Sequence, residues 1–329
     1  MRSNGKVFLV ASLLAMLVAG CAGGQTDQQT RAQVRLPMGF VPNVQYAPFY
    51  VADARGYFDE AGIDITFDYS AETDGIALVG SGELPFTLAS GEQVLLARQQ
   101  GAPVVYVFAW WQDFPVAVAA PTELGLKSPA DLAGLAVGLP GRFGASYIGL
   151  RALLSVAGLT EDDLQLESIG FNQVEALATG QVEAVVVYAN NEPIQLRAQG
   201  FDIDVLRVSD HVELASNGLV TNETTIAENP DLVRAMVAAI DRGLQDTLAD
   251  PEAAYTISQD YVEGLAEADR QIQMEVLLTS IAFWQAERLG EANAQAWVNM
   301  QQLLLTMEML TEQQPLGDAY TNQFLPELQ

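Results

Sequence analysis

The sequence is poor in the side chains that most often carry catalysis or bind metals. It has one cysteine, Cys21, and one histidine, His211, among 329 residues. One cysteine excludes a disulfide within the chain, and one histidine without a second beside it cannot complete a typical zinc site. A Gly-x-Ser-x-Gly nucleophile motif is also missing. We therefore expect no metal, no catalytic residue, no cofactor and no enzyme activity.

Positive charge is scarce as well. The chain has 15 lysines and arginines against 42 aspartates and glutamates, a formal net charge of -27. A surface this acidic repels nucleic acids and anionic lipid headgroups, so we expect no nucleic-acid partner. It provides no long-range attraction for an anionic ligand either, although helix N-termini can still build a local anion site.

Long hydrophobic runs are limited to the N-terminus. Val7 to Ala19 is uncharged and apolar, and it follows Arg2 and Lys6. Its length suits the core of a signal peptide and is too short for a membrane-spanning helix, which needs about 20 apolar residues. After Val34 no other apolar run is long enough to cross a membrane.

The apolar run ends in Leu17-Val-Ala-Gly-Cys21, which resembles the lipobox of bacterial lipoproteins. The resemblance implies that residues 1–20 are a signal peptide and that Cys21 becomes a lipidated N-terminus. Residues 21–33 are rich in Gly, Gln and Thr, which predicts a flexible tether. We expect a protein held by lipid on the extracytoplasmic face of the cell membrane.

The remaining chain alternates strand-like and helix-like segments, which is typical of α/β proteins. The first two are a strand predicted over residues 34–40 and a helix predicted over residues 47–61, ended by Gly62. The order helix, glycine turn, acidic residue and buried strand occurs at residues 75–90 and returns at residues 174–188. This internal similarity predicts two topologically similar lobes. A helix-rich final third, beginning with a clear amphipathic helix over 230–248, is expected to pack around them.

Several segments resemble the substrate-binding proteins related to thiamine pyrimidine synthase. The resemblance is carried by Phe40–Ala52, Gly56–Asp64, Gly82–Phe86 and Ser128–Gly134, and it spans nearly all of the mature chain. Members of that family bind thiamine pyrimidine precursors, riboflavin or, in distant branches, sulfonates. With the lipobox and the aromatic residues below, the chain looks most like the riboflavin-binding lipoproteins of bacterial ABC importers.

The resemblance implies a type II periplasmic-binding-protein fold, α/β, with two lobes joined by two crossover strands. Lobe 1 would comprise residues 34–119 and 220–329, and lobe 2 residues 120–219. The ligand would sit between the lobes, and the protein, as a monomer, would deliver it to an ABC permease and its ATPase.

A flat heteroaromatic ring needs apolar faces on both sides. Trp110 and Trp111 stand out because they are adjacent at the end of a predicted strand. Neighbouring strand residues point to opposite faces, so one ring is expected in the core and the other in the cleft, unless both only pack. The candidate aromatic ligand contacts are Tyr46, Tyr50, Trp110, Trp111, Tyr147 and Tyr188.

Polar candidates follow the predicted strands, where open α/β sheets place their ligand sites. Asn43 could bind a pyrimidine-dione edge or bond its own turn. Glu92 could accept from a ring N–H or simply favour the start of a helix. The polar and backbone candidates are Asn43, Ser90, Glu92, Gly144, Asn172 and Glu192.

Three functions remain open at this point. The first is capture of riboflavin, which would be cargo and not a cofactor. The second is the same role for a thiamine pyrimidine precursor, although a one-ring ligand would leave part of a large aromatic cleft unfilled. The third is an enzyme of pyrimidine biosynthesis, which the shortage of catalytic side chains argues against.

Overall fold

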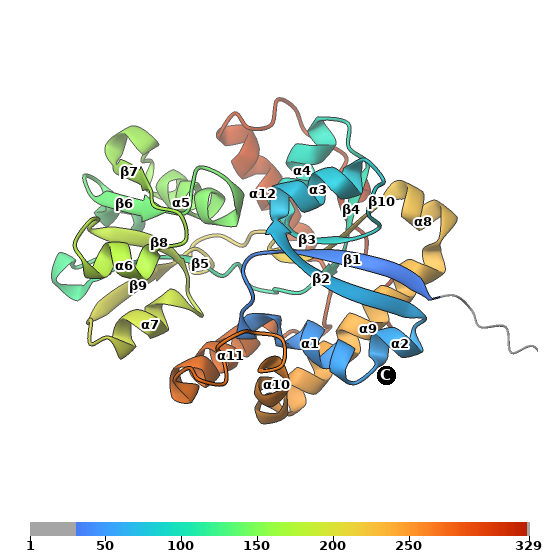
Figure 1. The fold of residues 1–329 in the computed structure, drawn as a ribbon. Coiled ribbons are helices and arrows are strands. Elements are labelled where there is room, and N and C mark those ends of the chain that lie inside the picture. Colours follow the sequence, from blue (N-terminus) through green and yellow to red (C-terminus); the bar gives the residue numbers. More distant parts are fainter. Residues whose placement is uncertain (1–30, 328–329) are drawn as a thin grey trace, which may run out of the picture. The chain divides into compact units, whose positions relative to one another are not determined.

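The computed structural model describes residues 31–327, in which helices and strands alternate (Figure 1). β1 (Ala32–Gly39) and β2 (Ile63–Ala71) form a parallel pair. β3 (Thr87–Ser90), β10 (Asn217–Asn222) and β4 (Val104–Ala109) form an antiparallel sheet with β10 in the centre. All residues of these three strands are buried, which suits the β-branched and aromatic residues of β4.

A five-stranded mixed sheet makes up the second half of the architecture. Its order is β7 (Gln165–Ser168), β6 (Ala136–Leu139), β8 (Ala184–Tyr188), β5 (Val116–Pro121) and β9 (Ile203–Arg207). Alternate side chains of β5 enter different core clusters, because successive strand residues face opposite sides of a sheet. β5 is therefore covered on both faces.

We call the part built around β1–β4 and β10 lobe 1, and the part built around the five-stranded sheet lobe 2. The chain passes from lobe 1 to lobe 2 between β4 and β5 and returns between β9 and β10. The lobe boundaries predicted at residues 119/120 and 219/220 thus fall inside β5 and β10.

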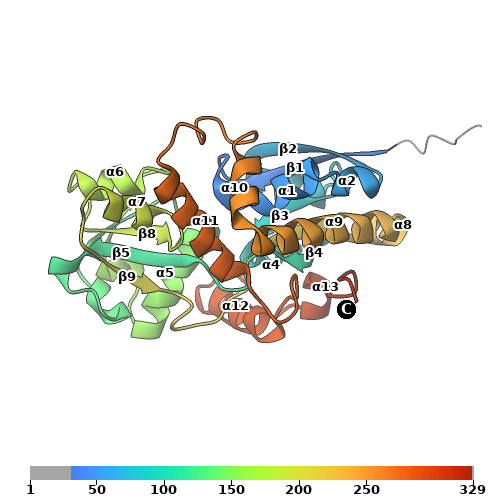
Figure 2. The same cartoon turned by 90° about the horizontal axis from the view of Figure 1, so that it is seen from below.

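Helices flank the sheets and form most of the C-terminal third. Figure 2 shows α11 between α7 and α10, and α11 also contacts the short 3-10 helix η1 (Val44–Tyr46), so it touches both lobes. The helices are α1 (Ala47–Ala54), α2 (Tyr57–Glu60), α3 (Glu72–Gly80), α4 (Gly91–Gln99), α5 (Gly144–Ala157), α6 (Gln173–Ala178), α7 (Glu192–Ala198), α8 (Glu223–Glu228), α9 (Pro230–Ala249), α10 (Pro251–Ser258), α11 (Arg270–Trp284), α12 (Ala294–Thr306) and α13 (Leu316–Ala319).

Two predicted elements differ from the structure. The helix expected over 47–61 is interrupted, because Gly56 adopts a left-handed conformation with φ of 73° and separates α1 from α2. The first strand begins at Ala32, two residues before the predicted start at Val34, and Ala32 pairs with Ile63. The end of the expected tether is therefore part of a sheet.

The predicted signal peptide over 1–20, Cys21 and the predicted tether up to residue 30 lie outside the described residues. Within residues 31–327, no helix is both long enough and apolar enough to cross a membrane.

Candidate functional site

A cavity of about 350 Å³ lies between the two lobes. Lobe 1 contributes the end of β1 and the segment after it, η1, the end of β2, the start of α3, the residues directly after β4 and the start of β10. Lobe 2 contributes the loop before α5, the loop before α6, and the segment that joins β8 to α7. Such a position between lobes, at the ends of strands, is where α/β proteins commonly bind small molecules.

Three buried aromatic rings form the floor of this cavity: Tyr46, Trp110 and Trp111. Each side chain is at most 3% exposed. The Tyr46 and Trp110 rings are stacked, with centroids 5.2 Å apart and planes 27° apart, and the Trp110 and Trp111 centroids are 5.4 Å apart. The floor thus offers apolar surface to a flat ligand.

The two tryptophans are not divided between the core and the cleft as predicted. β4 ends at Ala109, so the alternation of a strand no longer applies to Trp110 and Trp111. Both rings line the cavity, and both also pack against Trp284 in α11. The expected division into one core ring and one cleft ring was wrong.

The mouth of the cavity is also aromatic but more exposed. Phe40 of lobe 1 meets Phe171 of lobe 2 edge to face, with centroids 4.9 Å apart. Phe143 and Phe171 are 54% and 57% exposed. We call Phe40, Phe143 and Phe171 the mouth residues.

Two glutamates give the cavity wall its acidic character. Glu192 accepts hydrogen bonds from the Tyr188 backbone N–H at 2.9 Å and from the Asn191 amide at 3.3 Å. Glu72 accepts from the Asn217 amide at 2.7 Å. Burial raises the pKa of both carboxyl groups, and the hydrogen bonds oppose this shift.

A hydrogen bond crosses the cavity between the lobes. The Tyr188 hydroxyl of lobe 2 donates to Asn217 Oδ1 of lobe 1 at 3.1 Å. Burial and the nearby acids Glu72, Glu92 and Glu192 raise the pKa of the Tyr188 hydroxyl well above its usual value, so it remains a donor. Among the described lining residues there is no lysine, arginine or histidine.

Half of the predicted ligand contacts line the cavity. The structure brings them together from η1, the end of β4, the start of α5 and the β8–α7 segment. They are Tyr46, Trp110, Trp111, Gly144, Tyr188 and Glu192.

Three other candidates from lobe 1 lie outside the lining. Asn43 Oδ1 accepts from the Gln45 backbone N–H at 3.0 Å and caps η1, so it bonds its own turn. Tyr50 is buried and stacks on Tyr261, with centroids 4.6 Å apart. Ser90 is also buried and lies behind the wall, where its hydroxyl contacts Glu72 and Glu92.

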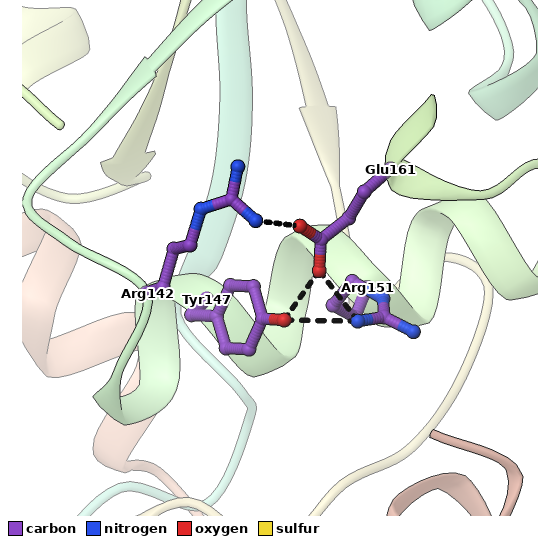
Figure 3. A network of polar contacts seen from close by, with 4 residues as sticks. All are labelled: Arg142, Tyr147, Arg151 and Glu161. Carbon is purple, nitrogen blue, oxygen red and sulfur yellow. Dashed lines mark hydrogen bonds and ion pairs between the residues drawn. The ribbon is translucent and has the colours of Figure 1, made fainter. Parts of the chain in front are cut away.

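The remaining candidates outside the lining are Glu92, which is fully buried behind the wall, and two residues of lobe 2. The Tyr147 hydroxyl donates to Glu161 in the network of Figure 3. Asn172 is exposed and donates to the Ile169 carbonyl at 3.1 Å. Its neighbour Gln173 lines the cavity instead.

The sequence interpretation missed Glu72 and Asn217. Glu72 directly follows the last residue of β2, and residues after strands are expected near a site of this kind, so its position carried a usable signal. Asn217 lies at the start of β10, a strand that was not predicted from the pattern.

Comparisons with known proteins fit this geometry. Residues 43–254 match the family model described as NMT1/THI5 like. The riboflavin-binding protein RibY of Chloroflexus aurantiacus is 38% identical over 98% of both chains. The chain belongs to the NMT1/THI5-like family.

Other members of the NMT1/THI5-like family differ in role. The formylaminopyrimidine-binding protein of Halalkalibacterium halodurans is 30% identical over 76% of this chain and 77% of that protein. The 4-amino-5-hydroxymethyl-2-methylpyrimidine phosphate synthase of Legionella pneumophila is 23% identical over 90% and 93%.

Solved structures confirm the predicted fold class. The periplasmic aliphatic sulphonate binding protein SsuA from Escherichia coli superposes with a TM-score of 0.72 at 15% identity, over 90% of this chain and 94% of that one. The NMT1/THI5-like chain therefore has the two-lobe periplasmic-binding-protein fold. Its identity to RibY, together with this fold, supports a binding protein for a ligand.

Proposed function

We propose that this chain is an extracytoplasmic lipoprotein that captures riboflavin between its lobes and delivers it to the permease of an ABC importer. The observation that carries the proposal is the lining of the cavity. It combines a stacked aromatic floor with two glutamates, and its described residues include no lysine, arginine or histidine. The identity to RibY supports the same ligand.

The chemistry of riboflavin suits this lining. Its ring system is flat and neutral, so it can lie on the floor formed by Tyr46, Trp110 and Trp111. Its ring N–H and the hydroxyls of its ribityl chain are donors for the wall carboxylates, while its carbonyls can accept from the amides of the lining. The lining amide side chains are Gln45, Gln93, Gln173, Asn191 and Asn217.

A sulfonate suits the same cavity poorly. An anion placed beside Glu72 and Glu192 would meet like charge without a cation in the lining to offset it. The structural likeness to a sulphonate-binding protein thus supports the fold and not the ligand.

Capture requires binding and closure without any chemical step. The Tyr188–Asn217 hydrogen bond and the Phe40–Phe171 contact both join the lobes. A ligand that contacts both lobes adds to these interactions and therefore favours the closed arrangement. A monomer closed on riboflavin would dock on the permease, whose ATPase drives release. Riboflavin is cargo here, and the protein needs no cofactor and performs no catalysis.

A pyrimidine precursor of thiamine is the second candidate ligand. It is favoured by the 30% identity to a formylaminopyrimidine-binding protein. A single ring would cover less of the aromatic floor and would not reach the mouth residues.

A ligand titration separates these candidates. Tryptophan fluorescence of the purified protein is recorded with riboflavin, formylaminopyrimidine and an alkanesulfonate. We expect strong quenching by riboflavin alone and recovery of unchanged riboflavin from the complex. Tighter binding of the pyrimidine would select the second candidate, and conversion of either compound would show an enzyme.

The lipid anchor requires its own experiment. Expression in bacteria with labelled palmitate should label the wild-type chain and not Cys21→Ala, and the wild type should partition into detergent. Equal labelling of both would contradict lipidation at Cys21, whatever the ligand is.

A further inference from the structure

Behind the cavity wall, two glutamates approach one serine hydroxyl. Ser90 Oγ lies 2.8 Å from Glu72 Oε2 and also contacts Glu92 Oε1. A hydroxyl has only one proton to donate. If both carboxyl groups were ionised, one of these two contacts would join oxygens without a proton between them. A proton on one glutamate supplies the missing donor.

The surrounding donors indicate which glutamate carries the charge. Glu72 accepts from the Asn217 amide at 2.7 Å and from the Ser90 backbone N–H at 3.4 Å. Glu92 has only the Gln93 amide at 3.4 Å as a side-chain donor besides Ser90, and its Oε2 is buried without a partner among the described residues. Glu72 is therefore the better-supported carboxylate.

The electrostatic surroundings agree with this assignment. Tyr46 and Tyr188 lie near Glu72, whose charge adds to burial in raising the pKa of both hydroxyls, and Tyr188 is also near Glu92. No described lysine, arginine or histidine pairs with either glutamate. Burial, and after it the charge of Glu72, raise the pKa of Glu92 to about 8.

We propose that Glu92 is held as a neutral acid that donates to Ser90, and that Ser90 in turn donates to Glu72 and fixes it as the charged acceptor for an N–H or O–H donor of the ligand. Glu72 lines the cavity, whereas Ser90 and Glu92 do not. Glu72 is thus a ligand-binding residue, and Ser90 and Glu92 are positioning residues. The inference rests on the proposed function for the choice of riboflavin as probe.

The relay makes ligand binding depend on pH. When Glu92 loses its proton, Ser90 can no longer satisfy both carboxylates, and two buried charges repel each other beside the ligand. If only the protonated form binds well, affinity falls about tenfold between pH 7 and pH 9. The conservative variant Glu92→Gln keeps a donor for Ser90 and stays neutral, so it should remove this dependence.

The first measurement uses ligand-free protein. Wild type, Glu92→Gln and the exposed control Glu83→Gln are unfolded thermally between pH 5 and pH 9. The unfolded chain releases the Glu92 proton near its ordinary pKa of 4.5, whereas the folded chain keeps it up to about 8. Wild-type stability should therefore fall as pH rises through this window and level off above it. Glu92→Gln should show a flatter profile, and Glu83→Gln should follow wild type.

The second measurement titrates riboflavin across the same pH range and adds Glu72→Gln and Glu92→Ala. We expect Glu72→Gln to bind riboflavin weakly at every pH and Glu92→Ala to lose affinity. Glu92→Gln should bind riboflavin as well as the wild type at pH 7, with an affinity that does not change with pH. Parallel wild-type and Glu92→Gln curves, in stability or in affinity, would overturn the proposal.

Two further outcomes are decisive. If Glu92→Gln does not fold, infrared spectra of the wild type replace it, and a protonated carboxylic acid band must disappear between pH 7 and pH 9. Its absence at pH 7 would overturn the relay. If riboflavin binds at no pH, the proposed function fails, while the ligand-free stability profile still decides whether Glu92 holds the proton.

Discussion

The floor and the mouth of the cavity are both aromatic, but the protein holds them in different ways. The floor rings of Trp110 and Trp111 are at most 3% exposed and pack against Trp284. The mouth rings of Phe143 and Phe171 are more than half exposed and lie on loops between strands and helices.

This difference separates two tasks that aromatic residues perform in a binding protein. The floor belongs to the folding core, so it is rigid before the ligand arrives and can orient a flat ring. The mouth contributes little to folding, because truncating an exposed side chain changes the free energy of unfolding only slightly. It can move with the lobes and retain the ligand after entry.

The largest effect is expected at the floor, for Trp110→Ala. Removing a buried tryptophan should lower the free energy of unfolding by about 3–5 kcal/mol. Loss of the stacking surface should also weaken riboflavin binding by about 10- to 100-fold, if stacking on this floor resembles base stacking on aromatic side chains. Denaturant unfolding and fluorescence titration measure the two effects.

Trp297→Ala is the matched control for the floor. Trp297 is 1% exposed and stacks on Tyr320 with centroids 5.0 Å apart, and it does not line the cavity. Trp297→Ala should lower the free energy of unfolding about as much as Trp110→Ala, but it should not weaken riboflavin binding. Equal affinities of the two variants would show that the floor only supports the fold.

The next effect concerns the hydrogen bond that joins the lobes above the floor. Tyr188→Phe leaves Asn217 Oδ1 without its donor, which costs about 1 kcal/mol and should weaken riboflavin binding about fivefold. Tyr255→Phe serves as control, because it removes a buried hydroxyl that donates to the Leu265 carbonyl, and neither residue lines the cavity. Isothermal titration calorimetry on both variants decides whether the bridging bond contributes to closure, and identical affinities would argue against it.

At the mouth, Phe171→Ala should separate retention from stability. The side chain is 57% exposed, so the free energy of unfolding should change by less than about 0.5 kcal/mol. Loss of the contact with Phe40 should speed riboflavin release about 3- to 10-fold, since such ring pairs contribute about 0.5–1.5 kcal/mol.

Stopped-flow release kinetics measure this change. The control is Leu278→Ala on α11, another apolar side chain with 49% exposure that lies outside the lining. If both variants release riboflavin at the wild-type rate, the mouth does not retain the ligand and the comparison between floor and mouth fails.

The sequence was sufficient to predict the fold class and the three residues of the floor. Strand and helix periodicity, together with the segments around Phe40–Gly62, led to the two-lobe architecture that the solved structures confirm. Tyr46 and the tryptophan pair were predictable because they follow strands or turns at the expected edge.

The acidic wall was harder to predict from sequence. Ser90 ends β3 and Glu92 follows it, close to the predicted end of this strand, but Glu72 lies between these two residues and the cavity. Asn217 reaches the site only because β10 returns to lobe 1 and pairs with β3 and β4. Such long-range pairing leaves no local signal in the sequence. The end of a buried strand, in contrast, is visible in the local sequence pattern.

The smallest effect is expected where a surface network holds the mouth. Arg142, next to Phe143, and Arg151 both pair with Glu161, which also accepts from the Tyr147 hydroxyl (Figure 3). Burial tends to raise the pKa of Glu161, but the Tyr147 hydroxyl and the two arginines outweigh it and lower the pKa. The network therefore stabilises the fold above the ordinary carboxyl pKa, and this contribution is lost as pH falls below it.

Glu161→Gln should cost less than about 1 kcal/mol at pH 7, because partly exposed ion pairs contribute little. On acidification, the free energy of unfolding of the variant should also fall less than that of the wild type. In this variant Glu161 no longer holds the loop that carries Phe143. The rate of riboflavin release should therefore rise by no more than about threefold. The control is Glu252→Gln, which breaks an exposed pair with Arg270 on lobe 1. It should lower stability about as much as Glu161→Gln does, but it should leave the rate of riboflavin release unchanged. An effect of Glu161→Gln as large as that of Trp110→Ala would place the mouth in the folding core and break the distinction between the two regions.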